Sequence, residues 1–160
     1  MTGGKGLLGT EIVRRLEARG ATVTSASRRT GVDLVTGKGL EAALHGADCV
    51  VHAATHRLRY RRVDLDGTRS MIKILARRST PPHLIYVSIV GCDQIPQRYY
   101  RVKYACELVL ERSRLPVTVV RATQFHTLIT EIASTVTIGP VAFVPRDMSF
   151  QPCGPSLDRR

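Results

Sequence analysis

Two groups of residues in this sequence have the types and the spacing that chemistry requires. The first is the glycine-rich stretch Thr2-Gly3-Gly4-Lys5-Gly6-Leu7-Leu8-Gly9, which runs directly into an amphipathic segment at residues 10–19. Glycines let the backbone approach an anion, and the free N–H groups and dipole of a following helix favour negative charge. The second is Tyr99 with Lys103, four residues apart and so on one face of a helix. An ammonium beside a phenol stabilises the phenolate, so such a tyrosine can donate and accept protons near neutral pH.

The glycines fit two overlapping spacings. Gly4, Gly6 and Gly9 match G-x-G-x-x-G, the pattern of dinucleotide-binding turns, whereas Thr2, Gly3, Gly6 and Gly9 match T-G-x-x-G-x-x-G. Glycine turns are common before helices, so the motif is weak by itself. The elements that follow must decide whether it holds a phosphate.

Strand-like and helix-like segments alternate along the chain. Strands are expected at 22–27, 33–35, 49–54, 84–90, 117–120 and 141–144, and helices at 10–19, 40–44, 63–78, 99–112 and 125–134. The nearly unbroken apolar run Cys49–Ala54 is typical of a parallel strand covered on both faces. The alternation predicts βαβ units and therefore an α/β fold with a doubly wound, Rossmann-like parallel sheet.

In such a sheet, ligands bind at the carboxyl ends of the strands. Arg28 and Arg29 follow the strand at 22–27, where an NAD-specific domain places an acid on the ribose 2′-hydroxyl. Guanidinium groups there pair with a 2′-phosphate instead, so we expect NADP(H) to be preferred over NAD(H); the alternative is an incidental basic turn. Ala53, Ala54 and Thr55 are small, which allows a cofactor to lie close to the backbone, although packing alone also requires small residues.

Five segments in order resemble the atypical short-chain dehydrogenase/reductases, in particular their NmrA-like, NAD(P)H-binding branch of actinobacterial type. They are Thr2–Gly9, Ala53-Ala54, Tyr86-Val87-Ser88-Ile89-Val90-Gly91, Tyr99-x-x-x-Lys103 and Arg121-Ala122-Thr123-Gln124-Phe125, and the resemblance extends from Met1 to about Pro152. It implies an oxidoreductase that reduces a carbonyl- or quinone-like small molecule with NAD(P)H. Tyr99 would then be the proton donor, and Lys103 would hold the nicotinamide ribose.

The resemblance also implies a set of cofactor-binding residues and a third catalytic residue, Ser88. The cofactor-binding set is Thr2, Gly3, Gly4, Gly6, Leu7, Leu8, Gly9, Arg28, Arg29, Asp33, Leu34, Ala53, Ala54, Thr55 and Lys103. We expect the NAD(P)-binding domain at residues 1–125 and a partial substrate-side segment, not an independent domain, at 126–160. The family includes members that bind the cofactor as redox sensors and reduce nothing.

The sequence departs from the family pattern in three places. Lys5 stands where a small residue or threonine is usual, and Ser88 is followed by Ile89 and Val90 where a catalytic hydroxyl is often found. Both ends look cut, so we expect the first strand and the closing C-terminal elements to be missing. A non-catalytic NADP(H)-sensing protein and an inactive truncated remnant therefore stay open as alternatives.

Composition narrows the function classes further. The net charge is +11, with arginine runs at 14–15, 28–29, 57–62 and 77–78, but no aromatic–basic stripe accompanies them, so solvated helix faces are favoured over nucleic-acid binding. No apolar run spans a bilayer and no secretory signal is evident, which predicts a cytoplasmic protein. The four cysteines and five histidines show no metal-ligand spacing; we expect a locally satisfied His52, and His126 is a candidate pocket residue. The substrate and the oligomeric state stay open.

Overall fold

The computed structural model describes residues 1–123, 137–138 and 141–142. The chain divides into two compact units, Met1–Arg121 and Ala122–Arg160. In the second unit, β4 (Thr137–Ile138) pairs antiparallel with β5 (Val141–Ala142). The helix expected at 125–134 lies outside the described residues, as do His126 and Cys153.

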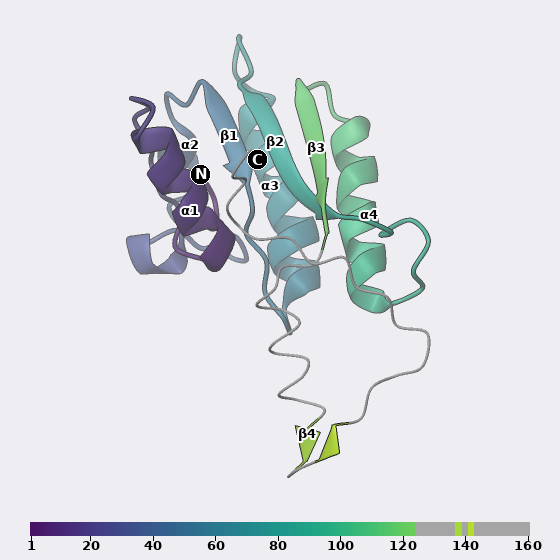
Figure 1. Ribbon diagram of the computed structural model, residues 1–160. Helices are drawn as coiled ribbons and strands as arrows, with labels where there is room; N and C mark the ends of the chain where they lie inside the picture. The colour runs from purple at the N-terminus through teal and green to yellow at the C-terminus, as the bar shows by residue number, and fades with distance from the viewer. Residues whose placement is uncertain (124–136, 139–140, 143–160) are drawn as a thin grey trace. The chain divides into compact units, whose positions relative to one another are not determined.

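The first unit contains a parallel sheet with helices packed on it. Its strands are β1 (Cys49–His52), β2 (His83–Ile89) and β3 (Val117–Ala122), in the order β1-β2-β3, and all three run in the same direction in Figure 1. The helix α3 (Gly67–Leu75) follows β1, and α4 (Arg98–Glu111) follows β2. The helices α1 (Leu7–Glu17) and α2 (Leu40–Leu44) lie at the β1 end of the sheet. The predicted α/β fold with a Rossmann-like parallel sheet is therefore confirmed.

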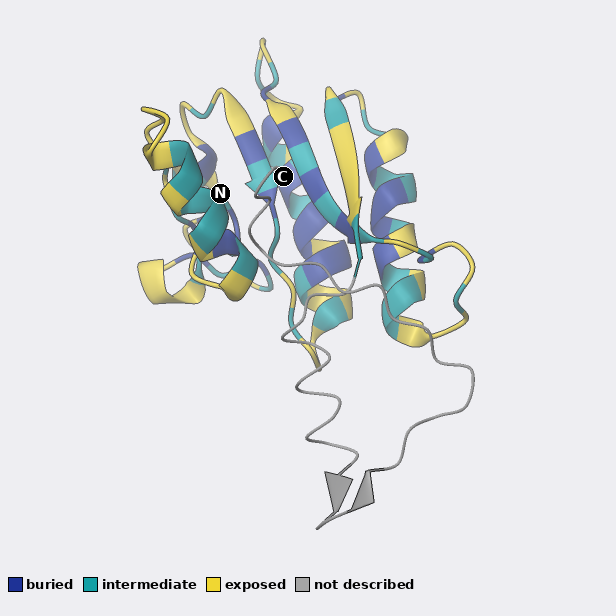
Figure 2. Cartoon of the chain, in the orientation of Figure 1, coloured by how far each residue is buried: buried dark blue, intermediate teal, exposed yellow. Residues whose placement is uncertain are grey.

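The buried residues form one hydrophobic core, and Figure 2 shows them in dark blue along the strands and the helices. Along β2, Leu84, Tyr86 and Ser88 are buried, while the residues between them are half-buried, because α4 covers one face of the strand. The principal contributors are Val50, Leu84, Tyr86, Leu40, Leu44, Met71, Leu75, Cys106 and Leu110. The sheet thus holds the first turns of α4 at the carboxyl ends of β1 and β2, since α4 runs back against the strand direction.

The start of the chain pairs with β1 at the edge of this sheet. Thr2 forms parallel bridges to both Ala26 and His52, and its N–H donates to the Val51 carbonyl at 2.9 Å. This is the place of the central strand in a doubly wound sheet. The prediction of a strand at 22–27 is wrong except for the bridge at Ala26. Among the described residues, only Met1 to Gly3 lie opposite this segment, so the rest of it has no strand to pair with.

Two other expected elements differ from the structure. Residues 33–35 form a turn and not a strand, since the Asp33 carboxylate accepts the Val35 N–H at 2.7 Å and the Asp33 carbonyl accepts the N–H of Gly37, whose φ is +77°. The helix expected at 63–78 begins earlier, as the π-helix η2 (Arg61–Asp66), which continues into α3. The predicted helices at 40–44 and 99–112 and the strands at 49–54, 84–90 and 117–120 are confirmed to within two residues at each boundary.

Candidate functional site

The glycine-rich turn at the start of the chain is tightly packed against its own backbone and against Ala54. We call this turn the cradle. Gly3 has φ +74°, and a Cβ on it would lie 2.7 Å from the Ala54 backbone nitrogen. A Cβ on Gly9 would overlap the Gly3 carbonyl oxygen, and the Gly6 N–H donates to that same oxygen at 2.9 Å. At Gly4 the obstacle is the Ser25 hydroxyl, a side-chain atom that can turn away. The backbone therefore requires glycine at Gly3 and Gly9, whereas a Cβ on Gly6 would make a tight contact of 3.2 Å with the Gly3 carbonyl oxygen.

This turn leaves the start of α1 open for an anion. Gly6 is the N-cap residue, it has no side chain to cap the helix, and no acid stands in the first turn. The first N–H groups of an α-helix have no partner within the helix, and together with the dipole they attract phosphate. Lys5 is exposed on the same turn and adds a positive charge; Leu7 is 57% exposed and Leu8 is half-buried. The cradle and the helix terminus fit the diphosphate of a dinucleotide.

Tyr99 and Lys103 come together at the carboxyl end of β2. The Tyr99 hydroxyl lies 3.2 Å from the Thr55 Oγ1, and the Lys103 Nζ lies 5.9 Å from the centre of the Tyr99 ring. Lys103 is 4% exposed, and its ammonium donates to the Val87 carbonyl at 3.2 Å. The two predicted catalytic residues are thus neighbours, and the positive charge lies beside the phenol.

Asp64 is a member of this cluster that sequence reasoning missed. It is fully buried in η2, its Oδ1 lies 3.1 Å from the Lys103 Nζ, and its Oδ2 accepts the Thr55 hydroxyl at 3.1 Å. Burial raises the pKa of the Asp64 carboxyl, and the Lys103 ammonium opposes that rise. A signal was present, because Asp64 is four and seven residues before the core residues Thr68 and Met71 and so shares their helix face.

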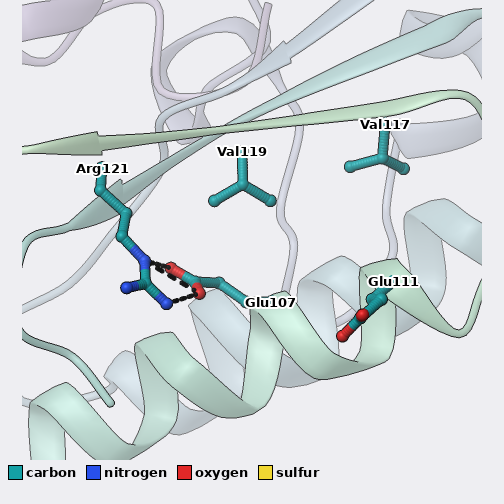
Figure 3. Close-up of a pocket in the computed structure, with 5 residues that line it drawn as sticks. All are labelled: Glu107, Glu111, Val117, Val119 and Arg121. Carbon is teal, nitrogen blue, oxygen red and sulfur yellow. Dashed lines mark hydrogen bonds and ion pairs between the residues drawn. The ribbon is translucent and has the colours of Figure 1, made fainter. Parts of the chain in front are cut away.

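Ser88 belongs to a different polar cluster. Its hydroxyl lies 3.8 Å from the Cys92 sulfur, and the Cys92 thiol donates to Glu107 at 3.2 Å. The Glu107 carboxylate in turn accepts hydrogen bonds from two nitrogens of Arg121, and the two side chains point toward each other in Figure 3. Within residues 1–123, no hydrogen bond joins Ser88 to Tyr99 or Lys103. The structure therefore brings only two of the three expected catalytic residues together.

An open groove of about 520 Å³ lies beside this second cluster, between β3 and α4. It is lined by Glu107, Glu111, Val117, Val119 and Arg121 (Figure 3). None of the residues predicted to bind cofactor or to act in catalysis lines it, so the groove is not the predicted site.

The other predicted cofactor residues divide between surface and core. Arg28 and Arg29 form the short 3₁₀-helix η1 (Arg28–Thr30), are exposed, and make no ion pair within the described part of the chain. Ala53 and Ala54 are half-buried against the Gly3 turn. In the turn after η1, Asp33 is half-buried while Leu34 is buried in the core.

His52 is buried and satisfied locally, as expected. Its Nδ1 lies 2.6 Å from the Thr2 hydroxyl, and its Nε2 lies 3.1 Å from the Thr68 hydroxyl. Burial, with a smaller contribution from the Lys103 ammonium, lowers the pKa of His52 to about 3. The ring is therefore neutral near pH 7 and has a structural role.

Comparison with known protein families identifies the family of this chain. The sequence profile of a family described as NAD(P)H-binding matches residues 3–138. The chain belongs to this NAD(P)H-binding family. The predicted resemblance is confirmed, and so is the binding of a nicotinamide cofactor as the family property. Uncharacterized proteins of Mycobacterium tuberculosis and Mycobacterium bovis are each 30% identical over 91 residues, which cover 50% of this chain and 11% of the relative.

Solved structures of this NAD(P)H-binding fold resemble the chain. A nucleoside-diphosphate-sugar epimerase from Staphylococcus aureus matches with a TM-score of 0.66 at 17% identity, over 84% of this chain and 53% of its own. An NADPH-dependent quinone oxidoreductase from Escherichia coli, complexed with NADPH, matches with a TM-score of 0.59 at 20% identity, over 84% and 52%. The triphenylmethane reductase of a Citrobacter species, complexed with NADP(H), matches with a TM-score of 0.61 at 15% identity, over 84% and 53%. The chain thus spans about half the length of these structures, and the likeness shows the fold.

No helix among the described residues is long and apolar enough to cross a membrane.

Proposed function

We propose that this chain is the cofactor-binding part of an NADPH-dependent reductase of the atypical short-chain class that acts on a carbonyl- or quinone-like small molecule. The observation that supports this most directly is the segment Ala54-Thr55, which joins the two halves of the site. Ala54 lies against the Gly3 cradle, and its neighbour Thr55 contacts the Tyr99 hydroxyl. The turn proposed to hold the phosphate and the proposed proton donor thus contact two adjacent residues of the backbone.

The proposal gives each group of residues a separate task. Thr2, Gly3, Gly4, Gly6, Leu7, Leu8 and Gly9 shape the phosphate turn, Ala53, Ala54 and Thr55 line the cofactor, and Asp33 and Leu34 form the turn below η1. Arg28 and Arg29 pair with the 2′-phosphate, which is why NADP(H) is preferred over NAD(H). When bound, the cofactor supplies the hydride. Residues 1–125 form the NAD(P)-binding domain, and residues 126–160 belong to the substrate side.

Tyr99 and Lys103 supply the acid–base chemistry in this proposal. Tyr99 holds its hydroxyl proton ready for the acceptor oxygen, and the charge that remains on Tyr99 is stabilised by the Lys103 ammonium, 5.9 Å from its ring centre. Lys103 is itself held in place by Asp64 and the Val87 carbonyl.

A Tyr99→Phe substitution tests this role. General acid catalysis contributes about 100-fold or more, so kcat with NADPH and probe acceptors such as 4-nitrobenzaldehyde should fall by at least that factor. The rise in unfolding temperature on adding NADPH should stay the same, because Tyr99 does not form the phosphate turn. Tyr100→Phe is the matched control, since Tyr100 is the adjacent residue of α4 and is also half-buried. Unchanged turnover in Tyr99→Phe would show that this phenol is not the proton donor.

A sensor that binds NADP(H) without chemistry is the second candidate. The observation that favours it is the placement of Ser88, whose hydroxyl faces Cys92 and not the Tyr99–Lys103 pair. A sensor would show the NADPH-dependent rise in unfolding temperature but would oxidise no NADPH with any carbonyl or quinone probe. Binding with turnover supports the reductase, and binding without turnover supports the sensor.

A further inference from the structure

A chain of hydrogen-bonding groups leads from Tyr99 into the protein through Thr55. The Thr55 hydroxyl lies between the Tyr99 hydroxyl, at 3.2 Å, and the Asp64 Oδ2, at 3.1 Å. A threonine hydroxyl has one proton to donate and lone pairs with which to accept. Since Asp64 accepts that proton, Thr55 receives a hydrogen bond from Tyr99. The direction of both bonds is thus set by the carboxylate.

Asp64 is suited to hold this direction. Its carboxyl group is fully buried, and the Lys103 ammonium at 3.1 Å compensates its charge. A buried carboxylate without such a partner is strongly destabilising, so the pair stabilises the ionised, accepting form. Thr55, by contrast, is exposed. The hydrogen bond to Asp64 therefore orients the Thr55 hydroxyl, while Thr55 remains accessible to solvent.

We propose that Thr55 returns a proton to Tyr99 after each turnover, with Asp64 as the residue that positions it. This inference rests on the proposed function. In the reduction, the Tyr99 O–H bond breaks as an O–H bond forms on the acceptor, whose hydride comes from the reduced nicotinamide. The Tyr99 phenolate then replaces the Asp64 carboxylate as the acceptor of the Thr55 hydroxyl. The Thr55 O–H bond breaks as that of Tyr99 re-forms, and in the same step the Thr55 oxygen takes a proton from solvent. The sum is one solvent proton delivered to the reduced acceptor.

The distances suit a site at rest. Both contacts lie slightly beyond the usual range of about 2.5–3.0 Å for O–H···O bonds. Catalytic hydrogen bonds are often long in the free protein and tighten when the reacting molecules are bound. Removal of the Thr55 hydroxyl should therefore slow the delivery of the proton without affecting the phosphate turn, which is built from backbone atoms of other residues.

The experiment compares Thr55→Val, which has a similar shape and no hydroxyl, with Thr55→Ser, which keeps the hydroxyl. With NADPH and 4-nitrobenzaldehyde as probes, Thr55→Val should lower kcat by about 10-fold or more, whereas Thr55→Ser should stay within about threefold of the parent. The ratio of kcat in H₂O to kcat in D₂O should rise in Thr55→Val, because proton return becomes rate-limiting. A merely structural role would not change that ratio.

A second measurement needs no substrate. In protein labelled with ¹³C-tyrosine, the Tyr99 signal is assigned by its absence in Tyr99→Phe; it should move in Thr55→Val and stay in place in Thr55→Ser. A Tyr99 signal that Thr55→Val leaves unmoved would overturn the inference, as would full activity of Thr55→Val where Tyr99→Phe is inactive. Full activity of Tyr99→Phe would overturn the proposed function itself, and the relay with it. Should Thr55→Val lose its cooperative unfolding transition, Thr55→Ala replaces it in both measurements.

Discussion

At the scale of single residues, the buried polar groups of this site are arranged in pairs that neutralise one another. Lys103 is paired with Asp64, and the imidazole of His52 lies between two hydroxyl groups. Each such group is costly to bury alone and tolerable when partnered. The site therefore depends on keeping His52 neutral as much as on keeping Asp64 ionised.

The burial of His52 predicts how stability depends on pH. Its folded-state pKa is lowered to about 3 from the ordinary value of 6.5, so the unfolded chain binds the proton first as the pH falls. The free energy of unfolding should consequently fall with falling pH below about 6.5, with a slope that approaches about 1.4 kcal/mol per pH unit. Urea unfolding between about pH 6.5 and pH 5, above the range in which ordinary carboxyls titrate, measures this slope.

His52→Gln provides the comparison for this slope. A glutamine has an oxygen and an NH₂ group that can bond to the Thr2 and Thr68 hydroxyls, and it does not titrate. The slope over the same pH range should be clearly smaller in His52→Gln than in the parent. An equal slope in both proteins would assign the pH dependence to other groups.

At the scale of the elements, the close approach of the glycine turn to two other segments organises the cofactor site. Gly9, in the first turn of α1, lies directly against the Gly3 carbonyl, and Gly3 lies directly against Ala54. These approaches join α1 to the residues that follow β1.

We expect Gly9→Ala to weaken NADPH binding by about 10-fold or more, because the added methyl group displaces the Gly3 carbonyl and with it the phosphate cradle. Substitutions that overpack a filled space also cost about 1–3 kcal/mol, so the midpoint of urea unfolding should fall as well. Thr10→Ala is the matched control, since Thr10 is the next residue of α1 and is exposed. Binding of NADPH by Gly9→Ala with the parent affinity would show that the cradle does not hold the phosphate.

At the scale of the whole molecule, the net charge of +11 favours anionic ligands in general, and local placement must supply any selectivity. Arg28 and Arg29 are exposed and without ion-pair partners in the described residues, so their charges are screened by salt. Measurements of cofactor binding at different ionic strengths, together with variants of Arg28 and Arg29, can therefore separate the contribution of the net charge from that of these two residues.

The preference for NADPH over NADH should shrink as salt is raised from about 0.1 M to about 1 M, where the Debye length falls from about 10 Å to about 3 Å. The double variant Arg28→Ala/Arg29→Ala should show little preference at either salt concentration. Arg19→Ala/Lys38→Ala removes the same charge from other exposed positions and should keep the preference. Dissociation constants from fluorescence titration decide this, and an equal loss in both variants would assign the preference to net charge alone.

The features that depend on residues a few positions apart could be predicted from the amino-acid sequence. The spacing of Gly3, Gly6 and Gly9 requires a tight turn before a helix, and four residues of separation place Tyr99 and Lys103 on one helix face. The alternation of apolar runs with helical periodicity likewise predicted most of the sheet and its helices. These rules are local, since they follow from backbone sterics and from the repeat of each element.

Which distant groups meet depends on how the whole fold packs. The helix face that Asp64 shares with Thr68 indicates burial, but its partner is decided by the fold, because only α4 brings Lys103 to the carboxylate. Ser88 was placed with Tyr99 by resemblance, but the β2 backbone turns its hydroxyl toward Cys92. The segment 22–27 has the composition of a strand, yet within the described part of the chain it forms a single bridge. A strand, a buried charge and a hydrogen bond each need a partner, and the position of a partner from another part of the chain is a property of the packed fold.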